Sequence, residues 1–413
     1  MSETINNIDP FEEKIKNLLI ETAEAEGFQN YTIEKGNGSM KGDGYLGIIK
    51  TAKIRAKDND KILNLVVKSA SKSDALRNHS AIGDIFEREI YMYNTVFTTF
   101  KAFEEEKGLP PCNFMPKFYN FLLEDRCETL ILENLKEAGY KLYKRRIPMN
   151  QDHVRLVLTE YGRLHALSFA LRDQDLEKFE EIIGGMDDRF VRGVLRSGFI
   201  KNFVLQCKKA QEALDKNKDK EVLDVYKEFI DTIPAFLENL PQLVDEYSVA
   251  LHGDCWTNNM MFKYEDEANP KKPTKVSFFD YQLSRLGSPA LDLLYFFYTC
   301  CPKEIINDLD CYLQLYYESF SNYLKKLGSD PDKMFPYSVL QRHWKKYAKY
   351  GLMMSVLIIH IMLTEKEEAV DFSDKWEAGE GIATAFDYEI KKVDAYNERI
   401  RPIILHFVER KLI

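Results

Sequence analysis

The sequence predicts an α+β protein of two lobes, a sheet-rich front lobe over residues 1–135 and a larger, mainly helical lobe over residues 136–413. Short β-type runs separated by glycines and polar turns fill much of the first part, with one long helical segment among them. Long segments with helical spacing dominate the second part. A small β-type insertion between residues 248 and 280 interrupts those helices.

The front lobe is expected to begin with an amphipathic helix over residues 11–26, where apolar side chains recur at helical spacing until Gly27. Three β-type runs follow before residue 70, and polar turns between them predict an antiparallel meander. Residues 82–105 return to helical spacing. Two further β-type runs, residues 117–125 and 128–135, complete this lobe.

The rear lobe shows six long stretches of helical spacing and three β-type runs. The expected helices span residues 150–171, 200–216, 220–239, 303–327, 335–364 and 379–397. The β-type runs are SVALHGD, NMMFKYE and KVSFFD, all between residues 248 and 280. The most apolar stretch, residues 351–364, is too short to span a bilayer and is expected to be a buried core helix.

Composition is that of an ordinary globular protein, with 413 residues of which 45% are hydrophobic and 30% charged. A formal net charge of -9 argues against a nucleic-acid partner, because such proteins usually show a basic surplus. Seven scattered cysteines without metal-ligand spacing indicate reduced thiols, and the N-terminus lacks the order of a secretory signal. We therefore expect a cytoplasmic protein, and nothing in the sequence predicts a membrane or protein partner.

The segment HGDCWTNN, residues 252–259, lies between two β-type runs and is the most informative in the chain. A loop fixed at both ends by strands can hold Asp254 to orient a hydroxyl and Asn259 to bind Mg²⁺, as phosphoryl transfer from ATP requires. Asp280, which ends the run VSFF, would be the second Mg²⁺ ligand. The alternatives are an ordinary β-turn for the loop and a solvated strand end for Asp280.

A glycine-rich turn in the front lobe is a candidate phosphate-binding loop. Gly42, Gly44 and Gly47 match the pattern GxGxxG, with β-type sequence on both sides. A turn between two strands favours a loop that covers nucleotide phosphates, whereas a dinucleotide site needs a following helix. The same loop could instead be registered on Gly36 and Gly38, and a flexible hairpin is the structural alternative.

Lys68 ends the strand run LNLVVK, a position from which an ammonium can reach the α- and β-phosphates. A strand-end lysine that extends to solvent is the local alternative. The expected partner is a glutamate on the following helix. Glu89 lies on the flank of the apolar face, whereas Glu87 points elsewhere, so we favour Glu89.

Other polar residues have weaker signals. Backbone groups from Glu133 to Leu135 lie where the composition changes and could pair with an adenine edge, although a normal strand end explains them equally. His165 is interpreted as a packed core histidine. Asp292 either supports the catalytic loop through hydrogen bonds or sits in the first turn of a helix because the dipole favours it there.

In this order, the glycine loop, strand lysine, helix glutamate, HxDxxxxN segment and strand-end aspartate resemble the eukaryotic-kinase-like superfamily. The phrases HGDCWTNNMMF and FFDYQLSRLGSPALDLLYFF, with FEREIYMY and LHALSFAL, are similar to the ecdysteroid kinase-like family, which is related to choline and aminoglycoside kinases. The resemblance covers roughly residues 30–390. It implies a bilobal protein-kinase-like fold with ATP and Mg²⁺ as cofactors.

Motif by motif, the resemblance implies that Asp254 is the catalytic base and that Asn259 and Asp280 bind Mg²⁺. It also implies that Lys68 binds phosphate and that Glu89 is its ion-pair partner.

Two features argue against a protein substrate. Gly253 stands where protein kinases have arginine, and only about ten residues separate Asp280 from the helix expected near Pro289. We therefore expect an ATP-dependent kinase acting on a small-molecule hydroxyl, with ecdysteroids or similar hydroxylated metabolites implied by the resemblance. A choline- or aminoglycoside-type kinase and a non-catalytic protein that binds a hydroxylated ligand are the alternatives.

Overall fold

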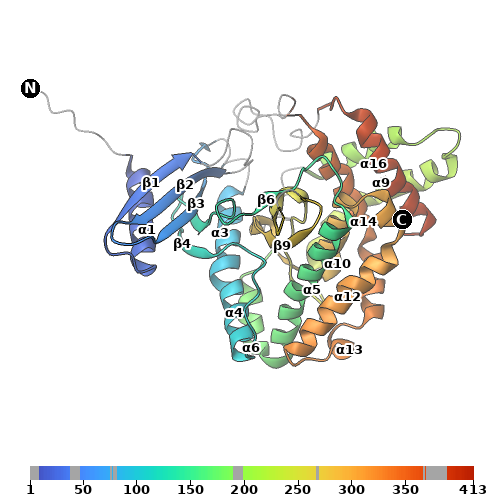
Figure 1. Cartoon of the computed structure of the whole chain (residues 1–413). Coiled ribbons are helices and arrows are strands. Elements are labelled where there is room, and N and C mark those ends of the chain that lie inside the picture. Colours follow the sequence, from blue (N-terminus) through green and yellow to red (C-terminus); the bar gives the residue numbers. More distant parts are fainter. Residues whose placement is uncertain are drawn as a thin grey trace, which may run out of the picture.

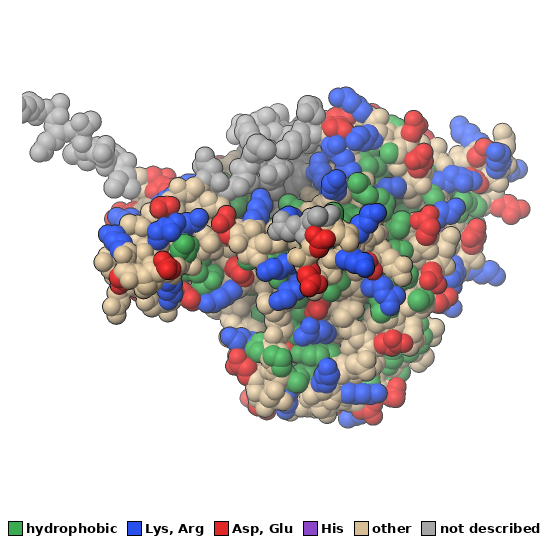
Figure 2. Space-filling model, in the orientation of Figure 1, with side chains coloured by type: hydrophobic (Ala, Val, Ile, Leu, Met, Phe, Trp, Pro, Cys, Tyr) green, Lys and Arg blue, Asp and Glu red, His purple; other side chains and the backbone are tan. Residues whose placement is uncertain are grey.

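The computed structural model describes residues 9–37, 47–74, 77, 81–188, 199–266, 269–365, 368 and 388–413. A twisted sheet occupies one end of the molecule and the helices of the rear lobe occupy the other, with α3 and α4 between them (Figure 1). Sheet and helical parts follow one another in the chain as the sequence predicts. On the face shown in Figure 2, acidic and basic side chains are interspersed over the described residues.

The front sheet is antiparallel and has the strand order β1-β2-β3-β5-β4. Its strands are β1 Tyr31–Asn37, β2 Gly47–Ala56, β3 Ile62–Ala70, β4 Phe118–Leu122 and β5 Thr129–Glu133. The meander predicted for the first three strands is confirmed. Helix α1, Pro10–Ala25, is capped by the Asp9 carboxylate, which accepts from the N–H of Phe11, and its apolar face packs against the sheet.

The helix expected over residues 82–105 is continuous but not uniform. It consists of α3 Ile82–Tyr91, a π-helical turn η1 Met92–Val96 and α4 Phe97–Glu106. A π turn adds a residue to the helical repeat and so rotates the buried face of the next helix relative to the one before it. Periodicity alone did not reveal this interruption.

The rear lobe is built from helices packed around one large apolar core. They are α5 Gln151–Gln174, α6 Leu176–Gly184, α8 Phe199–Ala210, α9 Lys220–Asn239, α10 Pro289–Cys300, α11 Lys303–Asn307, α12 Leu309–Lys326, α13 Pro331–Met334, α14 Tyr337–Leu363 and α16 Val393–Glu409. Short 3₁₀ turns are η2 Gln211–Ala213, η3 Leu240–Gln242, η4 Thr257–Asn259 and η5 Tyr281–Leu283.

Most of the predicted rear helices are present with shifted ends. The segment expected over 303–327 is two helices, because the chain breaks at Asp308 between α11 and α12. Of the helix expected over 379–397, residues 379–387 lie outside the described residues and residues 388–392 are not helical. The helix observed there, α16, begins at Val393 and continues well beyond the expected end.

Two small antiparallel sheets hold the segment between residues 249 and 287. Strand β8, Met260–Tyr264, lies between β6, Lys141–Leu142, and β9, Pro273–Phe278. Strand β7, Val249–Ala250, pairs with β10, Leu286–Gly287. The loop after β7 and the loop after β9 are therefore fixed on both sides.

Residues 351–363 belong to α14 and Thr364 is its C-cap, so the expected core helix is present. The stretch Pro331–Leu363 is long and apolar enough to cross a membrane, but 89% of its most apolar part is buried inside the protein. Its apolar surface is used for packing against α10, α8 and α16.

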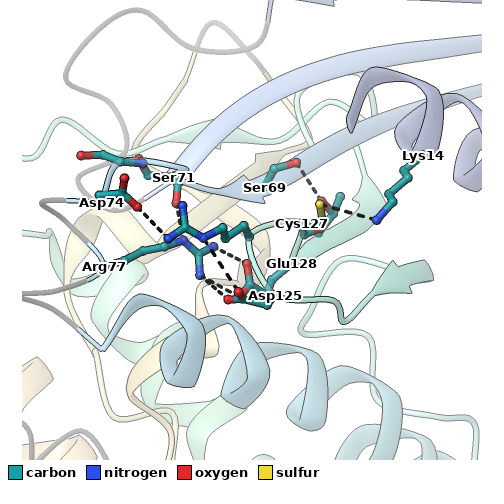
Figure 3. Close-up of polar contacts among 11 residues, drawn as sticks. Lys14, Ser69, Ser71, Asp74, Arg77, Asp125, Cys127 and Glu128 are labelled. Carbon is teal, nitrogen blue, oxygen red and sulfur yellow. Dashed lines mark hydrogen bonds and ion pairs between the residues drawn. The ribbon is translucent and has the colours of Figure 1, made fainter. Parts of the chain in front are cut away.

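An ion pair involves Arg77, a described residue between β3 and α3 (Figure 3). The guanidinium of Arg77 lies 3.0 Å from Oε1 of Glu128 and also contacts the second carboxylate oxygen, and its Nε donates to the Ser71 carbonyl. Glu128 is buried just before β5, so the pair ties the end of β3 to the start of β5.

Candidate active site

The loop after β7 adopts a backbone conformation that only glycine fits well. Gly253 has φ of +84°, and a Cβ atom there would lie 2.1 Å from the carbonyl oxygen of Leu283. The loop that follows Asp280 thus passes directly over Gly253. The glycine found in place of arginine is therefore required by close backbone packing.

Asp292 supports this loop through hydrogen bonds. Its Oδ2 accepts from the N–H of His252 at 2.7 Å, and its Oδ1 accepts from the N–H of Gly253 at 2.9 Å. The side chain is almost completely buried in the first turn of α10. Burial alone would raise the pKa of Asp292, but hydrogen bonding and charge from His165 and the N–H of Gly253 lower it. The first of the two interpretations of Asp292 is thus the one observed.

His165 is a fully buried residue, as expected, and it also supports the loop indirectly. Its ring lies between the Tyr316 hydroxyl, 2.9 Å from Nδ1, and Oδ2 of Asp292, 3.3 Å from Nε2. His165 holds the Asp292 carboxylate in place, and that carboxylate in turn binds two backbone N–H groups of the loop.

Asp254 is held by three hydrogen-bond donors. The Tyr295 hydroxyl donates to Oδ1 at 2.7 Å, and Oδ2 accepts from Asn259 Nδ2 at 2.7 Å and from Trp256 Nε1 at 3.2 Å. Burial, followed by the negative charge of Asp280, raises the pKa of Asp254 to about 6. The carboxylate is therefore oriented and unusually basic for an aspartate.

Lys68 in β3 lies between two carboxylates from distant parts of the chain. Its Nζ is 2.6 Å from Oε2 of Glu89 in α3 and 2.9 Å from Oδ1 of Asp280. Burial alone would lower the pKa of Lys68, but the charges of Asp280 and Glu89 raise it, so the ammonium stays protonated at neutral pH. The pairing favoured from the sequence, Lys68 with Glu89, is observed.

Asp280 lies two residues beyond the end of β9, not at the last position of the strand. Its φ of +66° is unusual for a residue other than glycine, and such conformations cluster at functional sites. With the Gln282 amide in the orientation that satisfies its neighbours, Nε2 donates to Asp280 Oδ1 and Oε1 accepts from Lys68 Nζ, both at 3.2 Å. The loop thus presents the carboxylate directly to Lys68.

Aromatic rings connect these loops to the helix that bears Glu89. Tyr281 follows Asp280, and its ring centroid lies 4.6 Å from that of His252 and 5.5 Å from that of Tyr93 in the π turn. The rings form a continuous packed row from the π turn to the loop after β7. The π turn places Tyr93 on this row.

Asn259 and Asp280 have the donor types that Mg²⁺ prefers. Because Nδ2 of Asn259 donates to Asp254, its Oδ1 is the atom left for a cation. The Asp280 side chain keeps 30% of its surface exposed. In the described part of the chain, no group of three or more His, Cys, Asp or Glu side chains could hold a metal alone. These two residues therefore fit a cation that takes its other oxygens from phosphates and water.

The glycine-rich turn is only partly placed. Gly42, Gly44 and the alternative Gly38 lie outside the described residues. Gly47 is the first residue of β2 and pairs with Ala70, and a Cβ atom there would lie 2.9 Å from the Phe86 ring. Gly36 lies within β1. The turn between β1 and β2 is thus flanked by strands on both sides, as the sequence predicts.

Strands β3 and β5 pair with each other, and Glu133 lies toward the opposite end of this pairing from Lys68. Leu135 lies two residues beyond the end of β5. Lys68 pairs with Leu130, and Glu133 pairs with Leu65, three positions and about 10 Å away. The N–H of Glu133 donates to the Lys117 carbonyl, and the Leu135 carbonyl accepts from the N–H of Tyr140. The Leu135 N–H, which has no hydrogen-bond partner among the described residues, is a backbone group available for a base.

Several residues of the site were not found from the sequence. Tyr295 lies in the mostly apolar sequence of α10, and nothing in that helix distinguishes it from Tyr298 one turn later. Trp256 was part of the motif, but its bond to Asp254 was not expected. The bond from Tyr295 to Asp254 spans 41 positions, and a contact at that range leaves no periodic signal in one sequence.

Comparisons with known proteins found a matching family and a curated relative. Residues 41–329 match the ecdysteroid kinase-like family. The chain is 27% identical over 220 residues to the 4-hydroxytryptamine kinase of Psilocybe cubensis, a match that covers 52% of this chain and 54% of that enzyme. The matched region thus spans about half the length of this relative.

Solved structures that resemble this chain at low sequence identity include an aminoglycoside phosphotransferase and a glucosamine kinase. The GDP complex of an aminoglycoside 2′-phosphotransferase-IIIa mutant has 10% identity and a TM-score of 0.42, covering 97% of this chain and 98% of that one. A glucosamine kinase in complex with glucosamine, ADP and inorganic phosphate has 11% identity and a TM-score of 0.41, covering 98% and 89%.

The family match covers well over half of the sequence and includes the two loops, Lys68 and Glu89 described above. The chain therefore belongs to the ecdysteroid kinase-like family.

Proposed function

We propose that this protein is an ATP-dependent small-molecule kinase that phosphorylates a hydroxyl group. The observation that supports this most directly is the convergence of Lys68, Glu89 and Asp280 beside an oriented, basic Asp254. These residues come from β3, α3 and the loops after β7 and β9. Membership of a kinase-like family supports the same reaction.

In the proposed reaction, Asp254 accepts a hydrogen bond from the acceptor hydroxyl and orients its oxygen toward the γ-phosphorus. The hydroxyl oxygen forms the new bond to phosphorus, the bond to the β–γ bridging oxygen breaks, and ADP leaves. Asp254 takes up the hydroxyl proton as the bond forms, which its raised pKa favours. Tyr295 and Asn259 keep the carboxylate in place during the transfer.

Lys68 is proposed to bind the α- and β-phosphates, with Glu89 holding its ammonium in position. Asn259 and Asp280 would hold Mg²⁺, which when bound neutralises charge on the β- and γ-phosphates. Gly42, Gly44 and Gly47 would cover the phosphates, and the Glu133 carbonyl and Leu135 N–H would pair with the adenine edge. The front lobe, residues 1–135, would thus bind nucleotide and residues 136–413 would supply catalysis.

The acceptor is proposed to be an ecdysteroid or a similar hydroxylated metabolite, as the family description suggests. An acceptor that also has an amine is the second candidate, because a relative at 27% identity is a 4-hydroxytryptamine kinase. The burial of the apolar helix α14 and the free cysteines support a location in the cytoplasm.

The test uses the wild-type protein and Asp254→Asn with Mg·ATP and a panel of hydroxylated sterols, hydroxytryptamines, choline and aminosugars. We expect wild-type turnover with one class and a loss of roughly 10²–10⁴-fold in kcat for the variant. Thermal stabilisation by Mg·ATP should persist in both proteins. Equal turnover in the variant would refute the role of Asp254. Absence of any nucleotide stabilisation in the wild type would favour a non-catalytic ligand-binding protein.

A further inference from the structure

Helix α3 is attached to the rear lobe by a buried arginine. The guanidinium of Arg88 donates to the carbonyls of Gly185 and Asp187, both at 2.6 Å, and to Oδ1 of Asp187 at 3.0 Å. The arginine is only 7% exposed. Three charge-assisted hydrogen bonds from one planar group fix its orientation as well as its position.

The same contact is reinforced one turn along α3. The Tyr91 hydroxyl donates to the Ile182 carbonyl at 2.9 Å, and a Cβ atom on Gly185 would lie 2.3 Å from the Tyr91 ring. The carbonyls that accept these bonds lie at the end of α6, where carbonyls lack helical partners and the helix dipole favours a cation. The end of α6 and α3 therefore fit each other closely.

The segment that binds Arg88 also contacts the loop on the other side of the candidate site. Asp188 lies 3.5 Å from the guanidinium of Arg285, and both side chains are largely buried. Arg285 follows Asp280 by five residues and lies over the Tyr350 ring. The cavity between α3, this segment and the Gln282 loop measures only about 10 Å³, which is room for a single water at most.

We infer that Arg88 is a positioning residue for nucleotide binding. It holds α3 against residues 185–187 so that the neighbouring Glu89 keeps Lys68 beside Asp280. Consecutive helical residues point about 100° apart, so Arg88 reaches the end of α6 while Glu89 faces the sheet. A rotation of α3 that releases Arg88 would also withdraw Glu89 from Lys68. This inference rests on the proposed binding of nucleotide by Lys68.

The experiment measures the dissociation constant of Mg·ADP by calorimetry for the wild type and Arg88→Gln. Arg172→Gln is the control, because Arg172 is a partly buried arginine that also donates to two backbone carbonyls, of Glu246 and Ser248, far from α3 in the sequence. We expect binding to weaken roughly 3- to 30-fold in Arg88→Gln and less than twofold in the control. Arg88→Lys keeps the charge but cannot span three acceptors, so its loss of Mg·ADP affinity should lie between those of Arg88→Gln and the control.

Double substitution separates positioning from a general loss of stability. If Arg88 acts through Glu89, Arg88→Gln should weaken Mg·ADP binding no further in a Glu89→Gln background. Equal weakening in both backgrounds, or equal weakening by Arg88→Gln and the Arg172 control, would overturn the inference. If Arg88→Gln does not fold, Arg88→Lys and Asp187→Asn undergo the same comparison. A wild-type protein that binds no Mg·ADP would instead refute the proposed function itself.

Discussion

Replacing Asp292 by Asn tests whether this residue supports the catalytic loop or only benefits from the helix dipole. The two residues are the same size, but the carboxylate accepts from two backbone N–H groups through different oxygens. An amide that keeps its oxygen near His252 must turn its NH₂ toward the N–H of Gly253, donor against donor. One buried N–H then loses its acceptor, whichever way the amide is turned.

The magnitude follows from the three contacts of the Asp292 side chain, with the N–H groups of His252 and Gly253 and with the His165 ring. A buried N–H without a partner costs about 1–3 kcal/mol, and the loss of charge weakens each of the two remaining contacts by about 1 kcal/mol. We therefore expect Asp292→Asn to lower the free energy of unfolding by about 3–5 kcal/mol. Because the displaced backbone carries Asp254, we also expect turnover to fall by roughly 10²-fold, as for a group moved by about 1 Å.

Asp310→Asn is the control, because Asp310 also lies in the first turn of a helix, α12, but is exposed and forms an ion pair with the exposed Arg410. It shares the dipole effect and should cost less than about 1 kcal/mol. Urea unfolding followed by tryptophan fluorescence is a suitable assay, since Trp256 lies in the loop. Equal losses for the two variants would show that the dipole alone explains Asp292.

Three further outcomes are expected. Gly253→Ala should lower the free energy of unfolding by more than the roughly 1–2 kcal/mol that a left-handed backbone costs, because its Cβ would also lie 2.1 Å from a backbone oxygen. An unchanged midpoint of urea unfolding would contradict this. Tyr295→Phe should reduce kcat at least about tenfold by freeing Asp254, whereas Tyr298→Phe in the same helix should not, as steady-state assays can show. Burial lowers the pKa of His406 to about 4, below its ordinary 6.5, so between these values the unfolded chain binds a proton that the folded protein does not. The contribution of neutral His406 to the free energy of unfolding should therefore be fully present above pH 6.5 and be lost as the pH falls toward 4. His406→Asn should flatten that fall in melting temperature, and an identical pH profile would exclude the histidine as its source.

Much of the candidate site could be predicted because each of its main residues sits at a recognisable place in a local pattern. Lys68 ends an apolar run, Glu89 flanks a helical face, and Asp254 and Asn259 lie in a loop between strands. Those patterns also define the strands, helix and loop that bring the residues together, so local periodicity and the family motif predicted the same site residues.

The residues that were missed act across long sequence distances. Tyr295 reaches Asp254 over 41 positions and Arg88 reaches Asp187 over 99, and neither interrupts the periodicity of its helix. The π turn at residues 92–96 changes which side of the following helix packs against the core, without changing the apolar composition of that helix. Asp280 was placed at a strand end, but its left-handed conformation depends on the loop packed over Gly253.

Helix α14 has a consequence for any shortened form of this protein. Its 27 residues extend about 40 Å, enough to cross the hydrocarbon core of a bilayer, and only the surrounding helices keep that surface from lipid and water. A fragment that retains α14 but lacks α10 and α16 would present a segment suited to insertion into membranes or to capture by chaperones. Deletion variants that remove either neighbour are thus expected to accumulate in the pellet.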